Sequence, residues 1–279
     1  MKYITINDLT ETIKKNLWKI PNDVDVIIGI PRSGMLCASI IASYLNIPLI
    51  DVNSFVSGMN PWGGSRVHYF DASHKKTNKV LVIDDTVFTG RAIKRAKKEL
   101  EGIKDVEFIY ACVYLEGKGE DVIDFYLEDV RMYTNNFSEL VLYEWNIFQH
   151  HIGLMSSSLY DLDGVLCSNC EDIENAPALF TPRTKIGGIV TYRLLKDADK
   201  IKEWLEKNEI RYGNLFMVNA DSWEEVEKNG TTPEKFKTYC YRNDFKYKLF
   251  VEGSDEQASA MSKMTKKPIF CVESNKIYQ

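Results

Sequence analysis

The stretch that decides the fold is Val80-Leu81-Val82-Ile83-Asp84-Asp85-Thr86-Val87-Phe88-Thr89-Gly90. Its first four residues are apolar and, apart from Leu81, β-branched, which is typical of a strand buried on both faces of a parallel sheet. Asp84 and Asp85 follow at the carboxyl end of the strand, where open α/β sheets bind their ligands. The stretch therefore predicts a parallel α/β sheet with a site at the end of this strand.

A turn rich in hydroxyl groups follows the two acids and leads into a helix expected over residues 91–100. The backbone N–H groups of such a turn, together with the positive end of the helix dipole, suit an anion. Two adjacent carboxylates suit the hydroxyls of a diol. The combination predicts a site for a phosphorylated sugar, and the alternative is an ordinary buried strand that ends in a turn.

The stretch resembles the phosphoribosyl-pyrophosphate (PRPP) motif of the type I phosphoribosyltransferases. This resemblance implies that Asp84 and Asp85 hold the ribose 2- and 3-hydroxyls. It also implies a loop that holds the 5-phosphate, formed by Thr86, Val87, Phe88, Thr89 and Gly90.

A second anion-binding candidate lies upstream, between a strand expected over 24–30 and a helix expected over 35–45, with a further strand over 48–52. Strand, turn, helix and strand form the βαβ unit of a parallel sheet. The turn combines glycine, a cationic side chain and a helix start. Because type I phosphoribosyltransferases have a pyrophosphate loop at this place, the resemblance assigns pyrophosphate to Pro31, Arg32, Ser33 and Gly34.

Two further segments of the first half are expected to border this site. The polar connection over 55–79 falls where the family has a mobile loop, so Arg66 is expected to neutralise the leaving pyrophosphate. Lys75 and Lys76 are either part of that function or ordinary solvated residues. Tyr143-Glu144-Trp145-Asn146 closes the half, with Trp145 interpreted as a packing residue and with Glu144 and Asn146 as residues on the acceptor side.

The second half carries another pair of acids, in Leu159-Tyr160-Asp161-Leu162-Asp163-Gly164. One carboxylate can attack a phosphoryl group while the other protonates the leaving oxygen, with Mg²⁺ neutralising the charge. The pattern resembles motif one, D-x-D-G, of the haloacid-dehalogenase (HAD) phosphatases. The resemblance implies four catalytic residues, Asp161, Asp163, Thr191 and Lys237, and four metal ligands, Asp161, Asp163, Glu252 and Asp255.

Some details of this second motif set depart from the family or stay open. Lys235 remains an alternative to Lys237, and Glu252 stands where Asp is usual. The intervals from Asp163 to Thr191 and from Thr191 to Lys237 are too short for a large cap domain. The fold expected is thus α/β, with two Rossmann-like domains: a type I phosphoribosyltransferase fold over 1–150 and a capless HAD-like phosphatase fold over 151–279.

Composition limits the class of protein, its partners and its compartment. The chain has 279 residues, of which 44% are hydrophobic and 27% charged, as in an ordinary globular protein. A net charge of -5 argues against a nucleic-acid partner, and no apolar run is long enough to span a bilayer. The six irregularly spaced cysteines indicate reduced thiols and a cytoplasmic protein. The sequence does not decide whether the protein forms a homo-oligomer.

Together the two sites predict transfer of 5-phosphoribose from PRPP to an acceptor, followed by removal of the 5-phosphate, with Mg²⁺ as cofactor. Purine-salvage relatives carry Asp where this chain has Phe88, and the loop pattern of orotate-type relatives is missing from 57–79. The whole chain resembles fused phosphoribosyltransferase–HAD proteins associated with bacterial polysaccharide synthesis. We therefore expect a glycan acceptor that receives ribofuranose. The alternatives are a nucleobase phosphoribosyltransferase coupled to nucleotide dephosphorylation, and a non-catalytic PRPP-sensing regulator.

Overall fold

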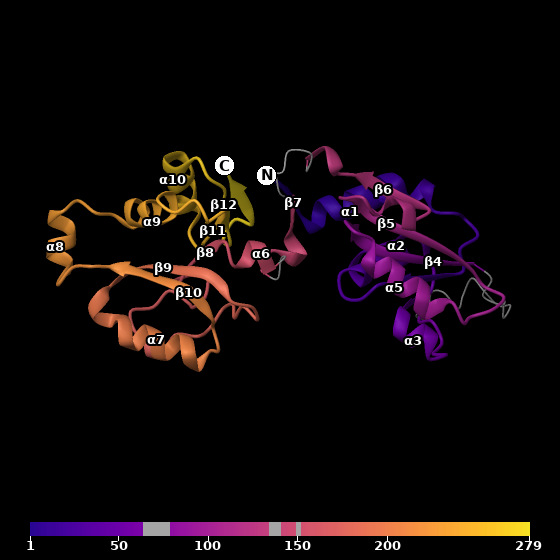
Figure 1. Cartoon of the computed structure of the whole chain (residues 1–279), viewed down its shortest axis with the longest axis horizontal. Coiled ribbons are helices and arrows are strands. Elements are labelled where there is room, and N and C mark those ends of the chain that lie inside the picture. The colour runs from indigo at the N-terminus through magenta and orange to yellow at the C-terminus, as the bar shows by residue number, and fades with distance from the viewer. Residues whose placement is uncertain (64–78, 134–140, 149–151) are drawn as a thin grey trace. The chain divides into compact units, whose positions relative to one another are not determined.

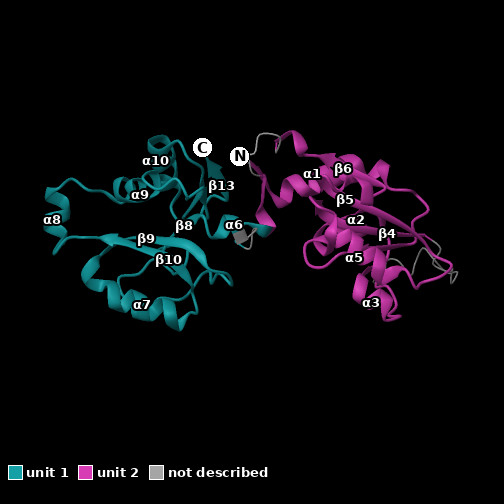
Figure 2. Cartoon of the chain, in the orientation of Figure 1, with its two compact units in different colours: residues 1, 146–279 teal, residues 2–145 magenta. Residues whose placement is uncertain are grey.

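The computed structural model describes residues 1–63, 79–133, 141–148 and 152–279, and it divides the chain into two compact units (Figure 1). The N-terminal unit comprises Lys2–Trp145 and is magenta in Figure 2. The C-terminal unit comprises Asn146–Gln279 together with Met1 and is teal.

The N-terminal unit is built on a five-stranded parallel sheet with the strand order β3-β2-β4-β5-β6. This confirms the expected α/β class with a parallel sheet. The chain runs from β2 outwards to β3 and then crosses to β4 on the other side, so the switch point lies between β2 and β4. The strands are β2 (Val26–Gly29), β3 (Leu49–Asp51), β4 (Lys79–Val87), β5 (Glu107–Leu115) and β6 (Phe125–Asp129).

Helices cover both faces of this sheet, which explains why its central strands are apolar throughout. On one face, Leu9 of α1 and Ile41 of α2 share a buried core with Leu81. On the other face, Ile93 of α5 packs into the core that contains Val82. The helices are α1 (Ile6–Asn16), α2 (Gly34–Leu45), α3 (Val52–Val56) and α5 (Arg91–Leu100).

Strand β4 is longer than the four apolar residues indicate. It continues through both acids to Val87, because β5 is equally long and keeps pairing with it: Asp84 lies opposite Cys112, and Val87 lies opposite Leu115. The acids therefore belong to the last part of the strand and do not follow it. The connection expected over 55–79 also begins later than predicted, because α3 occupies Val52–Val56.

A small second sheet fastens the two ends of the N-terminal unit to each other. Strand β1 (Lys2–Ile4) pairs in parallel with β7 (Val141–Tyr143), with Ile4 opposite Tyr143. Short 3₁₀ helices complete this unit at Leu17–Lys19, Gly119–Val122, Arg131–Tyr133 and Glu144–Asn146, the last of which runs into the C-terminal unit.

The C-terminal unit has a six-stranded sheet with the order β10-β9-β8-β11-β12-β13. Only the edge strand β13 is antiparallel to its neighbour. The chain moves from β8 outwards to β9 and β10 and then returns to β11, so the switch point lies between β8 and β11. The strands are β8 (Ser158–Asp161), β9 (Ile186–Leu194), β10 (Tyr212–Val218), β11 (Leu249–Glu252), β12 (Ile269–Cys271) and β13 (Lys276–Tyr278).

Helices flank this sheet on two sides, with α9 and α10 opposite α7 in Figure 1. Tyr241 of α9 and Met261 of α10 share a buried core with Leu159 and Phe250. The helices are α6 (Ile152–Met155), α7 (Ala198–Lys207), α8 (Trp223–Lys228), α9 (Pro233–Arg242) and α10 (Asp255–Thr265), with 3₁₀ turns at Ile173–Asn175 and Leu195–Asp197.

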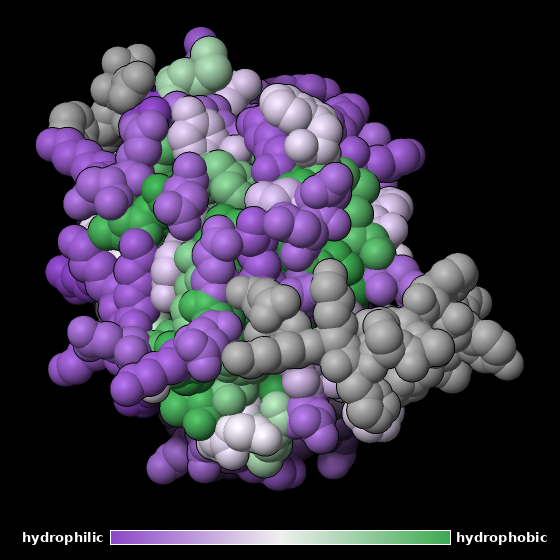
Figure 3. Space-filling model, turned by 90° about the vertical axis from the view of Figure 1, so that its right-hand side faces the viewer, coloured by the Kyte–Doolittle hydropathy of each residue, from purple (hydrophilic) through white to green (hydrophobic). Residues whose placement is uncertain are grey.

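Two surface properties complete the description. In the described part of the chain, no helix has both the length and the apolar character that crossing a membrane requires. Figure 3 shows hydrophobic residues interleaved with hydrophilic ones on the face that is turned towards the viewer. Exposed large apolar side chains include Trp62 (82% exposed) and Phe88 (60%), and the second belongs to the turn after β4.

Candidate functional site

The two sequence motifs of the first half line one cavity at the switch point of the N-terminal sheet. The cavity has a volume of about 380 Å³. It is lined by Ile30, Pro31 and Ser33 after β2, and by the continuous run from Asp84 to Ile93 at the end of β4 and the start of α5. Parallel strands bring residues 31–34 and 84–90 together because their carboxyl ends meet at one edge of the sheet.

Two glycines allow the backbone to approach the site closely. A Cβ atom on Gly34 would lie 2.9 Å from the carbonyl oxygen of Ile83 and 3.0 Å from Asp84 Oδ1, so the start of α2 packs directly against the first acid. Gly90 has a φ of 73°, and a Cβ there would lie 2.5 Å from Val122 Cγ2. Glycine is therefore required at both positions by packing, and at Gly90 also by backbone conformation.

Helices α2 and α5 both begin at this cavity, and neither N-cap residue, Ser33 or Gly90, makes a side-chain cap in the described structure. The first N–H groups of a helix have no partner within the helix, and the helix dipole adds positive potential there. By contrast, Thr5 caps α1 of the same unit with a full capping box. The start of α5 thus offers donors to an anionic ligand. At α2 the backbone N–H groups of Met35 and Leu36 already donate to the carbonyls of Arg32 and Ser33, at 3.2 and 3.0 Å, so fewer donors are available there.

The acid pair is almost completely buried, with Asp84 8% and Asp85 3% exposed. Asp84 Oδ1 accepts a hydrogen bond from the Asp85 backbone N–H at 3.0 Å. Burial raises the pKa of Asp84 well above its usual range, and the charge of Asp85 raises this pKa further. The folded protein therefore holds two adjacent carboxyl groups in a position where a ligand rich in hydroxyl groups can stabilise their charge.

Trp145 contacts this pair, a role that the sequence interpretation missed. Its indole Nε1 donates to Asp85 Oδ2 at 2.6 Å, so it is more than a packing residue. No local signal could have shown this, because 60 residues separate the partners. Glu144 beside it accepts a hydrogen bond from the Ile6 N–H at 2.7 Å, at the start of α1, and Asn146 is the first residue of the C-terminal unit's main segment.

The remaining residues predicted for this site are only partly described. Arg66, Lys75 and Lys76 lie outside the described residues. Arg32 follows Pro31, and the peptide bond between them is cis. Thr89 is exposed beside Phe88, so both side chains project from the turn.

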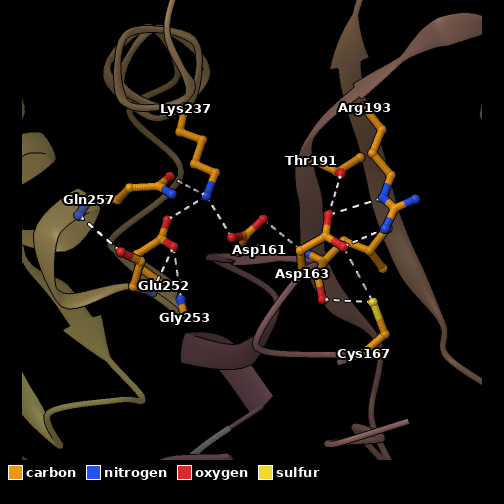
Figure 4. A network of polar contacts seen from close by, with 11 residues as sticks. Asp161, Asp163, Cys167, Thr191, Arg193, Lys237, Glu252, Gly253 and Gln257 are labelled. Atoms are coloured by element: carbon orange, nitrogen blue, oxygen red, sulfur yellow. Dashed lines mark hydrogen bonds and ion pairs between the residues drawn. The ribbon is translucent and has the colours of Figure 1, made fainter. Parts of the chain in front are cut away.

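The switch point of the C-terminal sheet holds a second polar cluster, shown in Figure 4. Asp161 ends β8, Glu252 ends β11, and Lys237 points towards both from α9. Lys237 Nζ lies 2.6 Å from Asp161 Oδ2 and 2.9 Å from Glu252 Oε2, and it also donates to Gln257 Oε1 at 2.8 Å. Lys235, the alternative lysine, donates instead to the Gly230 carbonyl at 2.9 Å, away from the acids.

The side chains of this cluster are buried, so the charge of each one strongly affects the pKa of its neighbours. Burial lowers the pKa of Lys237, but the charges of Asp161 and Glu252 outweigh that effect and leave the pKa raised, so the ammonium group stays charged. Burial also raises the pKa of Asp161 well above its usual range, and the charge of Glu252 adds to this while Lys237 opposes it.

Asp163 belongs to a neighbouring part of the cluster and is held by a residue that the sequence interpretation did not single out. Arg193 Nη2 donates to Asp163 Oδ1 at 2.7 Å and Nε donates to Oδ2 at 3.1 Å, while the same guanidinium donates to the carbonyls of Cys170 and Glu171. Thr191 Oγ1 donates to Asp163 Oδ2 at 3.3 Å. β9 continues to Leu194, so Thr191 and Arg193 share one face of the strand. That alternation was the signal that could have identified Arg193.

The four predicted metal ligands are not brought together as one set. Asp255 Oδ1 accepts a hydrogen bond from the Tyr278 hydroxyl at 2.5 Å, which places it in a contact with β13. Glu252 Oε1 folds back onto the N–H groups of Gly253 and Ser254, at 2.9 and 3.1 Å, because its arm is longer than that of Asp. Among the described residues, no group of three or more His, Cys, Asp or Glu side chains is arranged to hold a metal ion. As they stand, these side chains do not fit Mg²⁺, because Lys237 occupies the position between Asp161 and Glu252.

Comparison with known proteins supports the N-terminal assignment. A family model described as "Phosphoribosyl transferase domain" matches residues 3–146. No curated protein matches the sequence. A similar solved structure is the purine phosphoribosyltransferase from Pyrococcus horikoshii Ot3, with 21% identity, coverage of 52% of this chain and 94% of that chain, and a TM-score of 0.36. Another is the Helicobacter pylori xanthine-guanine-hypoxanthine phosphoribosyltransferase, with 12% identity, coverage of 52% and 92%, and a TM-score of 0.37.

The family match spans both motifs of the first cavity, and it ends one residue after Trp145. It covers just over half of the 279 residues, so this chain belongs to the phosphoribosyl transferase domain family.

Proposed function

We propose that the N-terminal unit transfers 5-phosphoribose from PRPP to an acceptor. The observation that carries this proposal is the single cavity lined by Asp84, Asp85 and the turn to Gly90, with the uncapped starts of α2 and α5 beside it. The two acids suit the ribose hydroxyls. One helix start suits the 5-phosphate and the other suits the pyrophosphate, as the assignments of residues 86–90 and 31–34 require.

In this reaction the bond between C1 of the ribose and a pyrophosphate oxygen breaks, and a bond from C1 to an acceptor oxygen forms. Pyrophosphate leaves with the bonding electron pair, and the acceptor hydroxyl releases its proton to solvent. The protein contributes positioning and charge for an oxocarbenium-like transition state. Mg²⁺ typically binds through one or two carboxylates plus substrate phosphates, and Asp84 with Asp85 fits such a donor set. Bound there with PRPP, the ion would neutralise charge on the leaving pyrophosphate.

We propose that the acceptor is a glycan. Phe88 presents an exposed apolar ring from the turn after β4, at the position where purine-salvage relatives carry Asp. An apolar ring does not offer a hydrogen-bond acceptor to a base. The resemblance of the whole chain to proteins of polysaccharide synthesis points in the same direction.

For the C-terminal unit we propose a HAD-like phosphatase that removes the 5-phosphate from the ribosylated product. The doubly wound strand order, the pairing of Asp161 with Lys237 and the position of Thr191 beside Asp163 support this assignment. The only helix between β10 and α9 is the six-residue α8, in keeping with the expected absence of a large cap. Asp161 would attack the phosphorus while Asp163 protonates the leaving ribose oxygen, which requires Arg193 to release Asp163. A water molecule would then hydrolyse the aspartyl phosphate, which releases phosphate and restores Asp161.

The first experiment measures pyrophosphate release from PRPP with a panel of glycans and nucleobases, and identifies the products by mass spectrometry. We expect release that rises with a glycan and a product that carries ribose. A ribosylated base instead would identify a nucleobase phosphoribosyltransferase. PRPP binding without release under any condition would identify a PRPP-sensing regulator and contradict the transferase proposal.

The second experiment tests the phosphatase with the Asp161→Asn variant, assayed with Mg²⁺ and with a chelator. We expect the phosphorylated product to accumulate, with loss of at least about 99% of phosphate release, because the nucleophile is gone. Lys235→Met is the matched control and should release phosphate normally. Phosphate release at the wild-type rate from Asp161→Asn would show that the HAD-like assignment is wrong.

A further inference from the structure

The indole of Trp145 donates a hydrogen bond to the side chain of Asp85. The distance from Nε1 to Oδ2 is 2.6 Å, at the short end for an N–H donor, which is typical of a hydrogen bond to a charged acceptor. The carboxylate is 3% exposed, so water contributes little to its stabilisation.

The surrounding structure holds this indole in place from three directions. Its ring lies 5.1 Å from the Tyr143 ring and 6.5 Å from the Tyr114 ring, the second nearly parallel at 21°. Tyr114 is itself fixed, because its hydroxyl donates to Thr12 Oγ1 at 3.2 Å. Pairing of β1 with β7 then sets the backbone that carries Trp145, and Glu144 fastens it to the start of α1.

This arrangement makes the two acids unequal. Asp85 receives a side-chain donor on Oδ2, whereas Asp84 receives the backbone N–H of Asp85 on Oδ1. A donor directed at one oxygen of a carboxylate fixes the plane of the group. The second oxygen of Asp85 is thereby oriented without help from the ligand.

We propose that Trp145 is a positioning residue of the PRPP site, which holds the Asp85 carboxylate oriented for the ribose hydroxyls. This inference rests on the proposed function of the N-terminal unit. Trp145 acts through Asp85 and is not itself a catalytic residue. It extends the site from the two motifs in the first 90 residues to the last residue of the unit.

Other titratable groups face the acid pair from the elements packed against it. They are Cys37 on α2, Cys112 on β5, Glu116 directly after β5, and Tyr143 on β7. Burial raises the pKa of Glu116 to about 7. Any pH dependence of PRPP binding therefore has to be compared between variants that keep these four residues unchanged.

The test measures the Kd for PRPP by isothermal titration calorimetry, with the wild-type chain and the Trp145→Phe variant, over a range of pH. Phenylalanine keeps an aromatic ring but removes the N–H donor. We expect Kd to rise about tenfold to a hundredfold, as for the loss of a hydrogen bond to a charged group. The ratio of the two Kd values is compared at each pH, so that titration of other groups near the site affects both proteins alike. Trp18→Phe, at a residue that is 78% exposed in the same unit, is the control and should leave Kd unchanged.

A double-mutant cycle with Asp85→Asn separates positioning from packing. If the bond to a charged carboxylate carries the effect, Trp145→Phe should change Kd by no more than about twofold in the Asp85→Asn background. An equal loss in both backgrounds would overturn the proposal, as would an unchanged Kd in Trp145→Phe alone. If the wild-type chain does not bind PRPP at all, the proposed function fails, which is a different result from failure of the Trp145 inference.

An NMR measurement tests the bond without PRPP. The indole N–H resonance of Trp145, assigned by its absence in Trp145→Phe, should lie downfield of that of Trp18 in the wild-type chain. It should shift towards the Trp18 position in Asp85→Asn. A resonance that does not change with the Asp85 substitution would overturn the inference.

Discussion

The two units of this chain place acidic residues at the switch point of a parallel sheet, yet they stabilise those acids in opposite ways. In the N-terminal unit, the described donors to Asp84 and Asp85 are neutral, namely a backbone N–H and an indole. In the C-terminal unit, Lys237 and Arg193 bring positive charge to Asp161 and Asp163.

The helices that begin near the two sites also differ in whether a side chain caps their first turn. Helices α2 and α5 start without a side-chain cap, whereas α9 and α10 are capped by Thr232 and Ser254. The N-terminal site therefore has donors and acceptors that a ligand can satisfy, and the C-terminal site satisfies most of its own. From this comparison we expect ligand binding to stabilise the N-terminal unit more, and loss of an internal partner to damage the C-terminal unit more.

The largest effect is expected from Lys237→Met, which leaves Asp161 and Glu252 buried without their cation. Removing one partner of a buried ion pair typically costs about 3–5 kcal/mol of stability. Urea unfolding followed by tryptophan fluorescence, which reports on Trp204 and Trp223 in this unit, measures the change. Lys235→Met is the control and should cost less than about 0.5 kcal/mol, because its ammonium group is exposed and donates to the Gly230 carbonyl. Equal losses of stability in the two variants would contradict the expectation that the C-terminal unit depends on its internal ion pairs.

An intermediate effect of opposite sign is expected from Asp84→Asn. Because the pKa of Asp84 is raised by burial and by Asp85, the folded state binds a proton that the unfolded state releases, so stability falls as pH rises above the usual carboxyl range. Asn removes this penalty and should raise stability at neutral pH by on the order of 1 kcal/mol, while PRPP affinity falls. Thermal unfolding between pH 5 and about 8 measures the change.

The control for this variant is Asp129→Asn. The Arg131 side chain lowers the pKa of Asp129, so its charge stabilises the fold, and the substitution should reduce stability at neutral pH. If Asp84→Asn also lowers stability, the ionised form of Asp84 does not destabilise the folded state. The acids of the two units then do not differ in the way in which they are stabilised.

The smallest effects separate capped from uncapped helices. Ser254 accepts the Gln257 N–H at the start of α10, so Ser254→Ala should cost about 1 kcal/mol in urea unfolding. Ser33 makes no cap on α2, so Ser33→Ala should leave stability unchanged and instead weaken PRPP binding. A stability loss in Ser33→Ala as large as that in Ser254→Ala would indicate that the hydroxyl serves the helix and not a ligand.

Much of the N-terminal architecture followed from local patterns. The apolar run before Asp84, the turn to Gly90 and the helix over 91–100 predicted a strand, a cavity edge and a helix, and the observed α5 has those same bounds. The extension of β4 to Val87 was not predictable from its own residues, because pairing with β5 sets where the strand ends.

In the candidate sites, too, some features could be predicted from local sequence and others could not. Local patterns predicted Asp84 and Asp85 as site residues, because acids at a strand end are a local signal, and the resemblance to known motifs implied Asp161 and Lys237. Only the tertiary structure decided that Trp145 donates to Asp85, that Arg193 holds Asp163, and that Asp255 contacts Tyr278 instead of the other acids. These partners lie 60, 30 and 23 residues apart, and which side chains meet over such intervals depends on how strands and helices pack, not on any one stretch of sequence.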